Sequence, residues 1–275
     1  MSIINAVRPT IIAEIARALG AVYVEGTAIT ATANTLTDAK NLLMPNADDI
    51  KGFPIYIWKG IDIGDDVIIG NFDATNHKLT AAVNFVATPT NTSQYIVLLP
   101  EWRVADFKDA INAAIRFASK SQLVPKVDET TTLATNTYEY TVPTGFAIIS
   151  RLIRESGSIA NVFSVVIPNH IWYINQAATR QICFYEHLSN PGAYNADRLR
   201  IEGFQFPSEM TNDTGSSQLD LAYLKAYACM TLLQSKLHKY PERANEFASW
   251  AREAYGLGER LTTPIPPDSV QVEYH

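Results

Sequence analysis

The sequence predicts an α+β protein in which a small bundle of about four helices carries two β-rich insertions. Apolar residues recur at helical spacing in four stretches of the chain, and between these stretches the apolar period changes to two over long runs. The chain has 275 residues, 47% of them hydrophobic, which is enough for one large core or two smaller ones. We expect the helices to meet in space despite the insertions, because loop-closure cost grows only slowly with loop length.

The bundle is expected to begin with a helix within residues 3–20. Pro9 suits the first turn of a helix, and Gly20 suits its end. The apolar residues that recur at helical spacing between them are Ile11, Ile12, Ile15, Ala16 and Leu19.

Residues 21–102 are expected to form the first β-rich insertion. Its clearest strand is the alternating run 78–85, and a shorter strand around residues 67–69 precedes it. The residues predicted on one face of the longer strand are Leu79, Ala81, Val83 and Phe85. Residues 73–77, between the two strands, are of types that bond to their own backbone in turns. The two strands are therefore predicted to form a hairpin.

The stretch from Gly60 to Phe85 also holds four aspartates, three glycines and a histidine, a composition that fits either a metal site or turn chemistry. A calcium loop of the EF-hand type needs oxygen ligands at alternating positions and a closing glutamate. The run from Asp62 has Gly64 and Ile68 where ligands belong. We therefore predict that these aspartates serve β-turns.

A second helix is expected at residues 104–122, with Asp106 as its cap. The second β-rich insertion is expected at residues 126–210. Within it, three large residues share one face of a strand: Tyr138, Tyr140 and Val142.

Residues 217–257 are expected to complete the bundle with two helices. The first is the long apolar stretch Gln218–Lys239, and the second opens at Pro241 and is closed by Gly256. Residues 258–275 are expected to form an extended C-terminal tail, because prolines interrupt it.

The C-terminal tail is the predicted partner-binding segment. Its prolines stop it from continuing as a helix, while apolar residues between and after them supply anchors, so we expect the tail from Arg260 to His275 to become ordered on contact with a partner. The candidate binding residues are Pro264, Ile265, Pro266, Pro267, Val270, Val272 and Tyr274.

Charge and composition disfavour several classes of protein. Lys and Arg total 22 against 28 Asp and Glu, a formal net charge of -6, which argues against a broad basic face for DNA or for an anionic membrane. No apolar stretch approaches the roughly 20 residues that a membrane span needs, so we expect a soluble chain with no membrane partner. Cys183 and Cys229 lie far apart in sequence and are predicted to be buried and reduced.

The residues that carry chemistry do not predict an enzyme. The sequence has no phosphate-binding Gly-rich loop, no metal-ligand spacing among its histidines and no Gly-x-Ser-x-Gly elbow. Two of the 28 acidic residues could converge for glycoside chemistry, but nothing in the sequence selects a pair. We therefore expect no catalytic residues, no metal and no cofactor.

Four stretches of the chain, taken in order, carry a resemblance to a known family. They are Phe107–Ala118, Tyr138–Leu152, Leu199–Met210 and Leu219–Lys236, and their sequence resembles the head-to-tail adaptor (connector) proteins of tailed bacteriophages. The earlier portion, from "ITATANTLTD" through "DIKGFPIYIWKG" to "DDVIIGNF" and "HKLTAAVNF", is similar to the β insertion of larger members. The resemblance covers roughly residues 3–256.

The resemblance implies a small helical bundle and a structural role in the virion. It implies a ring of twelve subunits beneath the portal protein, which docks the tail, or a stopper or nozzle protein, and continues the DNA channel. DNA would pass through the lumen without specific recognition, a role that the acidic net charge suits. The location implied is the neck of the virion, after synthesis in the host cytoplasm.

Two alternatives stay open at this point. Another neck or tail ring protein, such as a tail terminator, is poorly separated from an adaptor by sequence. A carbohydrate-binding virion protein would use the aromatic residues of the β-rich segments, such as Trp58 and Tyr173, although aromatic residues on strands more often pack in a core.

Overall fold

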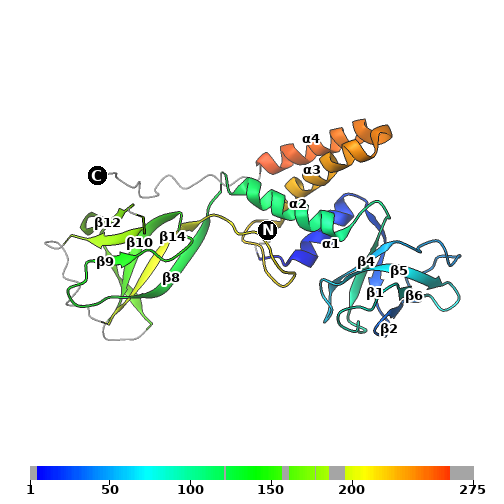
Figure 1. Cartoon of the computed structure of the whole chain (residues 1–275), viewed down its shortest axis with the longest axis horizontal. Helices are drawn as coiled ribbons and strands as arrows, with labels where there is room; N and C mark the ends of the chain where they lie inside the picture. The colour runs from blue at the N-terminus through cyan, green and yellow to red at the C-terminus, as the bar shows by residue number, and fades with distance from the viewer. Residues whose placement is uncertain (1–4, 121, 157–160, 177, 186–195, 261–275) are drawn as a thin grey trace. The chain divides into compact units, whose positions relative to one another are not determined.

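The computed structural model describes residues 5–120, 122–156, 161–176, 178–185 and 196–260. They form two compact units (Figure 1). The first unit comprises the described residues up to Lys120 together with those from Ser208 onward, and the second comprises the described residues between them.

The predicted fold class is wrong, because the described residues are mostly β-sheet. They contain 14 strands in three antiparallel sheets and four α-helices, rather than a helical bundle with insertions. The physical reason is that each β-rich segment encloses a hydrophobic core of its own, and these cores do not depend on the helices for burial. None of the described helices is long and apolar enough to cross a membrane.

Seven strands of the first unit form one sheet, in the order β1-β7-β4-β5-β6-β3-β2. They are β1 (Val22–Thr27), β2 (Thr30–Ala31), β3 (Thr35–Thr37), β4 (Pro54–Lys59), β5 (Asp66–Asp73), β6 (Lys78–Ala81) and β7 (Gln94–Leu98). All neighbouring strands are antiparallel.

Two consecutive residues close this sheet into a small barrel. The amide of Ala28 donates to the carbonyl oxygen of Ser93, 2.9 Å away, next to the β1–β7 ladder. The amide of Ile29 donates to the carbonyl oxygen of Thr37 on β3, 2.8 Å away. The chain therefore passes directly from one edge of the sheet to the other, and the barrel encloses a core that includes Phe72 and Tyr95.

The predicted hairpin of the barrel is confirmed, but its second strand is shorter than expected. β5 and β6 pair on either side of residues 74–77, and Leu79 and Ala81 are buried as predicted. The strand ends at Ala81, and the alternation fails there because Val83 is 62% exposed. Phe85 is buried, and its amide bonds to the carbonyl oxygen of Ala33 rather than continuing the ladder.

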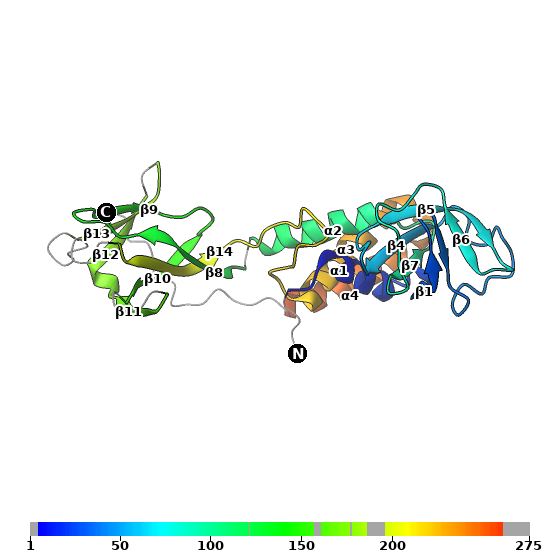
Figure 2. The ribbon, with the colours of Figure 1, turned by 90° about the horizontal axis from the view of Figure 1, so that it is seen from below.

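The helices of the first unit lie beside the barrel, with α1 in contact with β4 (Figure 2). They are α1 (Arg8–Ala18), α2 (Val104–Ala118), α3 (Leu221–Lys239), the short 3-10 helix η3 (Pro241–Arg243) and α4 (Ala244–Arg260). α1 ends just before Gly20, as predicted. The predicted cap Asp106 lies instead in the first turn of α2, where a carboxylate suits the helix dipole, and Arg103 occupies the cap position.

The last helix was predicted to end at Gly256, but α4 continues to Arg260. Close packing against Tyr227 explains why Gly258 occurs inside this helix. A Cβ atom at this position would lie 2.3 Å from a ring carbon of Tyr227 on α3, so the missing side chain allows the two helices to pack closely.

Asp213 joins segments of the first unit that are far apart in sequence. Its carboxylate accepts a bond of 2.7 Å from Arg8 Nε on α1 and one of 3.1 Å from Lys108 Nζ on α2. Arg8 also donates to the carbonyl oxygen of Met210 and is buried. A Cβ atom on Gly64, in the barrel, would lie 2.7 Å from the Asp213 side chain, so the barrel also packs closely on this carboxylate.

The second unit is a β-sandwich. One sheet has the order β11-β10-β14-β8, and the other has the order β12-β13-β9. The elements are β8 (Val124–Thr132), β9 (Glu139–Thr141), β10 (Ile148–Glu155), β11 (Phe163–Ile167), the 3-10 helix η1 (Asn169–Ile171), β12 (Trp172–Asn175), β13 (Gln181–Phe184) and β14 (Arg198–Gln205). Both sheets contribute to one core, in which Tyr140 and Val142 are buried and Tyr138 is partly buried, as their predicted common face implies.

An ion pair fastens β10 to the start of β14 in the second unit. Both carboxylate oxygens of Glu155 accept bonds from Arg198, and one of them also accepts the amide of Asn161. Bonding to Arg198 lowers the pKa of Glu155 to about 2.

Replacing Asp213 with Ala is expected to lower the free energy of unfolding of the first unit by about 3 kcal/mol, because it leaves the buried Arg8 guanidinium unpaired. Urea unfolding followed through the buried Trp102 measures this loss. The matched control is Asp48→Ala, which removes an exposed carboxylate and should change the free energy by less than about 0.5 kcal/mol. Equal effects of the two variants would contradict the role given to Asp213.

The second unit is expected to lose stability in acid through Glu155. Because its folded-state pKa of about 2 lies below the ordinary value of 4.5, the stabilisation is complete above pH 4.5 and is lost as the pH falls from 4.5 towards 2. Glu155→Gln should flatten this part of the stability profile, measured by urea unfolding through Trp172, the one tryptophan of this unit. A variant of the exposed Glu139, Glu139→Gln, should keep the slope.

Candidate functional site

The residues predicted to bind a partner lie outside the described residues. They are Pro264, Ile265, Pro266, Pro267, Val270, Val272 and Tyr274. The described chain ends at Arg260, the last residue of α4.

Of the aspartates in the stretch from Gly60 to Phe85, Asp73 has the β-turn role predicted for it, whereas Asp62 and Asp65 bond to a distant loop and Asp66 is the first residue of β5. Asp73 accepts the amides of Thr75 and Asn76 in the β5–β6 turn. Asp65 accepts the amide of Val86 at 2.7 Å, and Asp62 accepts the hydroxyl of Ser93 at 2.6 Å, so both hold the loop that leads into β7. Across the part of the chain that the structure describes, no group of three or more His, Cys, Asp or Glu side chains could hold a metal ion.

The two cysteines are buried and unpaired, as predicted. Burial raises the pKa of the Cys229 thiol to about 12 and also raises the pKa of Cys183. Neither thiol therefore has the thiolate character that a reactive cysteine needs.

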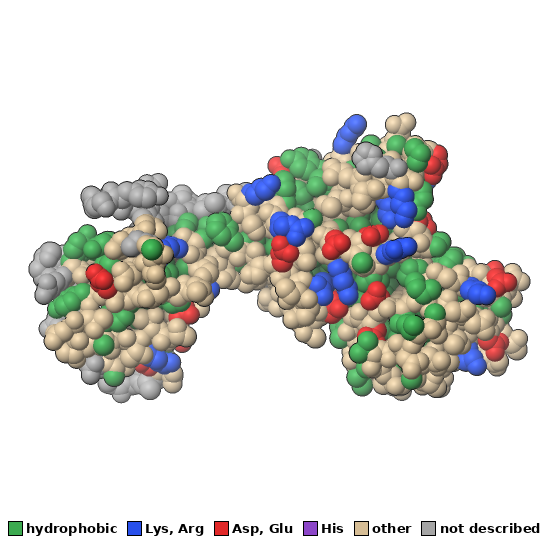
Figure 3. All heavy atoms as spheres, in the orientation of Figure 1, with side chains coloured by type: hydrophobic (Ala, Val, Ile, Leu, Met, Phe, Trp, Pro, Cys, Tyr) green, Lys and Arg blue, Asp and Glu red, His purple; other side chains and the backbone are tan. Residues whose placement is uncertain are grey.

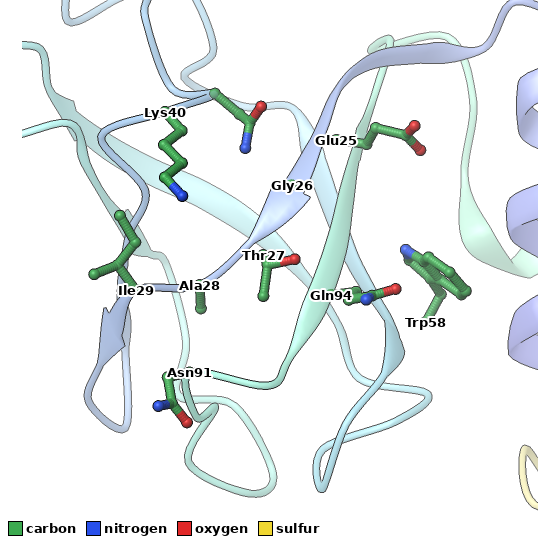
Figure 4. Close-up of a pocket in the computed structure, with 10 residues that line it drawn as sticks. Glu25, Gly26, Thr27, Ala28, Ile29, Lys40, Trp58, Asn91 and Gln94 are labelled. Carbon is green, nitrogen blue, oxygen red and sulfur yellow. The ribbon is translucent and has the colours of Figure 1, made fainter.

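A polar pocket of about 660 Å³ lies on the outer face of the barrel (Figure 4). Its floor comes from neighbouring strands, with Thr27 of β1 paired to Gln94 of β7. Figure 4 shows Trp58 at one end and Lys40 at the other. The remaining lining residues are Glu25, Gly26, Ala28, Ile29, Asn41 and Asn91.

Trp58 reaches this pocket because of a register shift in β4. Tyr95 pairs with Ile57 and Gln94 pairs with Lys59, so Trp58 is the extra residue between two regular pairs. The guanidinium of Arg17 lies 4.8 Å from the centroid of the Trp58 ring. Arg17 is itself held by Glu25 at 2.8 Å, so the position of the indole is fixed from α1 and from β1.

A buried carboxylate supports the pocket from within the barrel. Both oxygens of Asp38 are bonded, one to backbone amides and the other to Asn41 and to the hydroxyl of Tyr95. A Cβ atom on Gly26 would lie 2.2 Å from this carboxylate, so only glycine lets β1 pass over it. The pocket combines amide, hydroxyl and indole groups with the charged side chains of Glu25 and Lys40, a lining that suits a polar ligand.

Exposed apolar side chains lie on the connection between β4 and β5, on β5, and on the connection between β6 and β7, and we define Ile61, Ile68, Val83 and Val86 as the barrel-tip patch. Hydrogen bonds connect the segments that carry Ile68, Val83 and Val86: the amide of Ala82 donates to the carbonyl oxygen of Ile68, and the amide of Val86 donates to the carboxylate of Asp65. Val86 is 93% exposed. Apolar groups of this size on connected loops are typical of a contact surface.

The second unit has an exposed apolar edge of its own. β11 is an outer strand of its sheet, and Val162, Val165 and Val166 on or beside it are exposed. We define these three valines as the β11 edge. An outer strand offers both unpaired backbone groups and side chains to another chain. Figure 3 shows apolar side chains on the surface of both units.

A third apolar surface lies among the helices. We define the helical groove as the hollow of about 590 Å³ between the end of α1, α3 and α4. Its apolar lining includes Leu19, Ala226, Leu233, Trp250, Ala254 and Leu257. Trp250 is 40% exposed and Leu257 is 51% exposed.

Comparison of the sequence with models of protein families gives no match, and comparison with curated proteins gives none either.

Sequence reasoning missed both the pocket and the helical groove. Trp58 was noted only as one aromatic residue among several, because the register shift that exposes it depends on β7. The sequence does contain a signal for the groove, because the i, i+4, i+7 spacing of an apolar helix face occurs at Trp250, Ala254 and Leu257. Such a stripe predicts a covered surface but does not say what covers it.

Proposed function

We propose that this protein is a structural virion protein, the head-to-tail adaptor that forms a ring between the portal and the tail of a bacteriophage. In this role it binds the portal protein on one side and a tail, stopper or nozzle protein on the other. It carries out no reaction. DNA passes through its lumen without specific recognition, and the protein resides in the neck of the virion after synthesis in the host cytoplasm.

The observation that supports the proposal best is the presence of two different exposed apolar surfaces, one on each unit. A ring contact is heterologous, because each subunit must offer one surface to the neighbour ahead and a different surface to the neighbour behind. The barrel-tip patch and the β11 edge are such a pair of unlike surfaces. The sequence resemblance to adaptors points the same way and suggests twelve subunits.

The charge of the chain agrees with a conduit for DNA. A protein that grips DNA neutralises phosphates with Lys and Arg, and each such contact makes binding stronger and slows sliding. This chain has a formal net charge of -6, so acidic residues outnumber basic ones. A lumen with few basic contacts lets DNA move.

The decisive experiment is co-expression with the portal protein encoded in the same genome, followed by purification and negative-stain electron microscopy. Extra ring density stacked coaxially on the portal is the expected result. A ring that does not bind the portal but binds the end of a tail tube would indicate a tail terminator instead. A protein that stays monomeric beside both the portal and the tail tube would overturn the proposal.

Ring formation should depend on both apolar surfaces. Val86→Glu on the barrel-tip patch and Val166→Glu on the β11 edge are each expected to weaken assembly by on the order of tenfold or more, because each places an unpaired charge in a buried contact. Mass photometry of the oligomer measures the effect. Leu43→Glu is the matched control, since Leu43 is 62% exposed on the barrel but outside the patch. Loss of assembly in the control alone would refute this use of the surfaces.

A second candidate function is carbohydrate binding, which the polar pocket favours. An indole beside amide and hydroxyl groups can stack on a sugar ring and bond its hydroxyls. Titration with neutral hexose oligosaccharides should then change the tryptophan fluorescence of the wild type but not of Trp58→Ala, while Trp58→Phe should retain weakened binding. No response in the wild type would remove this candidate.

A further inference from the structure

The three-stranded sheet of the second unit has one face that does not contribute to the core (Figure 2). Successive residues of a strand point to opposite faces of a sheet. The side chains of β9, β12 and β13 that point inward and are buried in the core include Tyr140, Trp172, Ile182 and Phe184. The outward face therefore carries the residues between them, among which are Tyr173 on β12 and Tyr185 directly after β13.

Tyr173 and Tyr185 form one exposed aromatic surface, which we define as the tyrosine platform. The centroids of their rings lie 5.1 Å apart, and the ring planes are inclined by 37°. The backbone holds the two strands together here, because the amide of Tyr185 donates to the carbonyl oxygen of Ile171, 3.0 Å away. Tyr173 is 43% exposed and Tyr185 is 36% exposed. Aromatic rings exposed to this extent add little to the core and are typical of a contact with another molecule.

Neighbouring side chains help to fix the platform. Cys183 on β13 pairs with Tyr173 on one side and with Glu139 on the other. It belongs to the outward face and is nevertheless buried, so its neighbours on that face cover it. The pKa of the Tyr173 hydroxyl is raised, chiefly by Cys183, and burial, Tyr185 and Glu139 add to the effect. The rings, the thiol and the carboxylate therefore form one cluster, and rings already held in position lose little entropy when a ligand binds.

Polar groups that can bond to hydroxyls continue the same face of the sheet. Gln181 pairs with Thr141, and both lie two residues along their strands from the pair of Cys183 and Glu139, so these side chains share the outward face. Together they supply an amide, a hydroxyl and a carboxylate, which include both donors and acceptors. A sugar has an apolar face of C–H groups and a rim of hydroxyls. Aromatic rings bordered by polar groups are complementary to both parts of such a ligand.

The charge of this face separates a sugar from other ligands that stack on aromatic rings. Single-stranded nucleic acid also stacks on tyrosine, but its phosphates need Lys or Arg nearby. Among the described outward-facing residues of β9, β12 and β13, none is basic and Glu139 is acidic. Glu139 would also repel an acidic sugar. The ligand that fits this face is therefore a neutral sugar.

We propose that the tyrosine platform binds a neutral oligosaccharide by stacking against a sugar ring. Glu139, Thr141 and Gln181 bond to the hydroxyls of the bound sugar. This site is distinct from the polar pocket, which belongs to the barrel of the first unit. It also goes beyond the adaptor function, because it requires neither a ring nor the portal protein.

The test applies the full-length chain to an array of neutral oligosaccharides built from hexoses, pentoses and N-acetylhexosamines, and then titrates the best ligand by calorimetry. The wild type should bind a neutral glycan and should not bind sialylated or sulfated glycans on the same array. The double variant Tyr173→Ala/Tyr185→Ala should bind about tenfold more weakly or worse, because it lacks both rings. Tyr173→Phe/Tyr185→Phe keeps the rings and should bind within about threefold of the wild type. Tyr23→Ala is the matched control, since Tyr23 is 44% exposed on the barrel, and it should leave binding unchanged.

A second measurement needs no variant and so does not depend on how the Ala variant folds. Nitration of the wild type with tetranitromethane, mapped by mass spectrometry, should modify both tyrosines of the platform. The bound glycan should protect both of them and should not protect Tyr23.

Three results would overturn the inference. The first is that the wild type binds no neutral glycan on the array. The second is that the glycan binds but leaves the nitration of Tyr173 and Tyr185 unchanged. The third is that Trp58→Ala loses the glycan while Tyr173→Ala/Tyr185→Ala keeps it, which would assign the sugar to the polar pocket. None of these results decides whether a ring forms on the portal, so the adaptor proposal is tested separately.

Discussion

The first unit depends on one carboxylate. Asp213 neutralises Arg8 and Lys108 and lies against Gly64, so α1, α2, the barrel and the chain entering α3 meet at a single charged group. Burying an arginine is costly unless a partner compensates its charge, and here that partner comes from the far end of the sequence. This contact helps to fix α1 and α2 relative to the barrel. Because Arg17 of α1 lies over the Trp58 ring, the contact also bears on the position of the indole in the polar pocket.

The sequence allowed good prediction of local features and poor prediction of how they combine. The β5–β6 hairpin could be foreseen because Asp73 and its neighbours bond within the turn itself. The barrel could not, since its closure at Ala28 and Ile29 depends on pairing with strands that follow much later. Gly256 was predicted to end the last helix, but α4 continues to Arg260, and the role of Gly258 is visible only once Tyr227 lies opposite it. The predicted partner-binding residues form one continuous segment of the sequence. The helical groove could not be predicted in the same way, because residues from α1, α3 and α4 line it together.

The barrel and the β-sandwich differ in whether their sheets have free edge strands, and this difference affects what each can bind. The barrel has no free edge where Ala28 and Ile29 join its two ends, so its contacts must be made by side chains on loops, such as those of the barrel-tip patch. The sandwich keeps β11 as an outer strand and can offer backbone bonds as well. A subunit built from both has two unlike means of recognition, which suits contacts with several neighbours.

The pairing of Arg8 with Asp213 also has a consequence for synthesis on the ribosome. All strands of the barrel lie within residues 22–98, so the barrel can fold early, while Arg8 on α1 must wait for its partner, a residue about two hundred positions later. The whole second unit emerges during that interval, and its own core lets it fold meanwhile. Until Asp213 is made, the nascent chain carries a finished barrel and a helix α1 whose Arg8 lacks its carboxylate partner, a stage at which a chaperone has the most to protect.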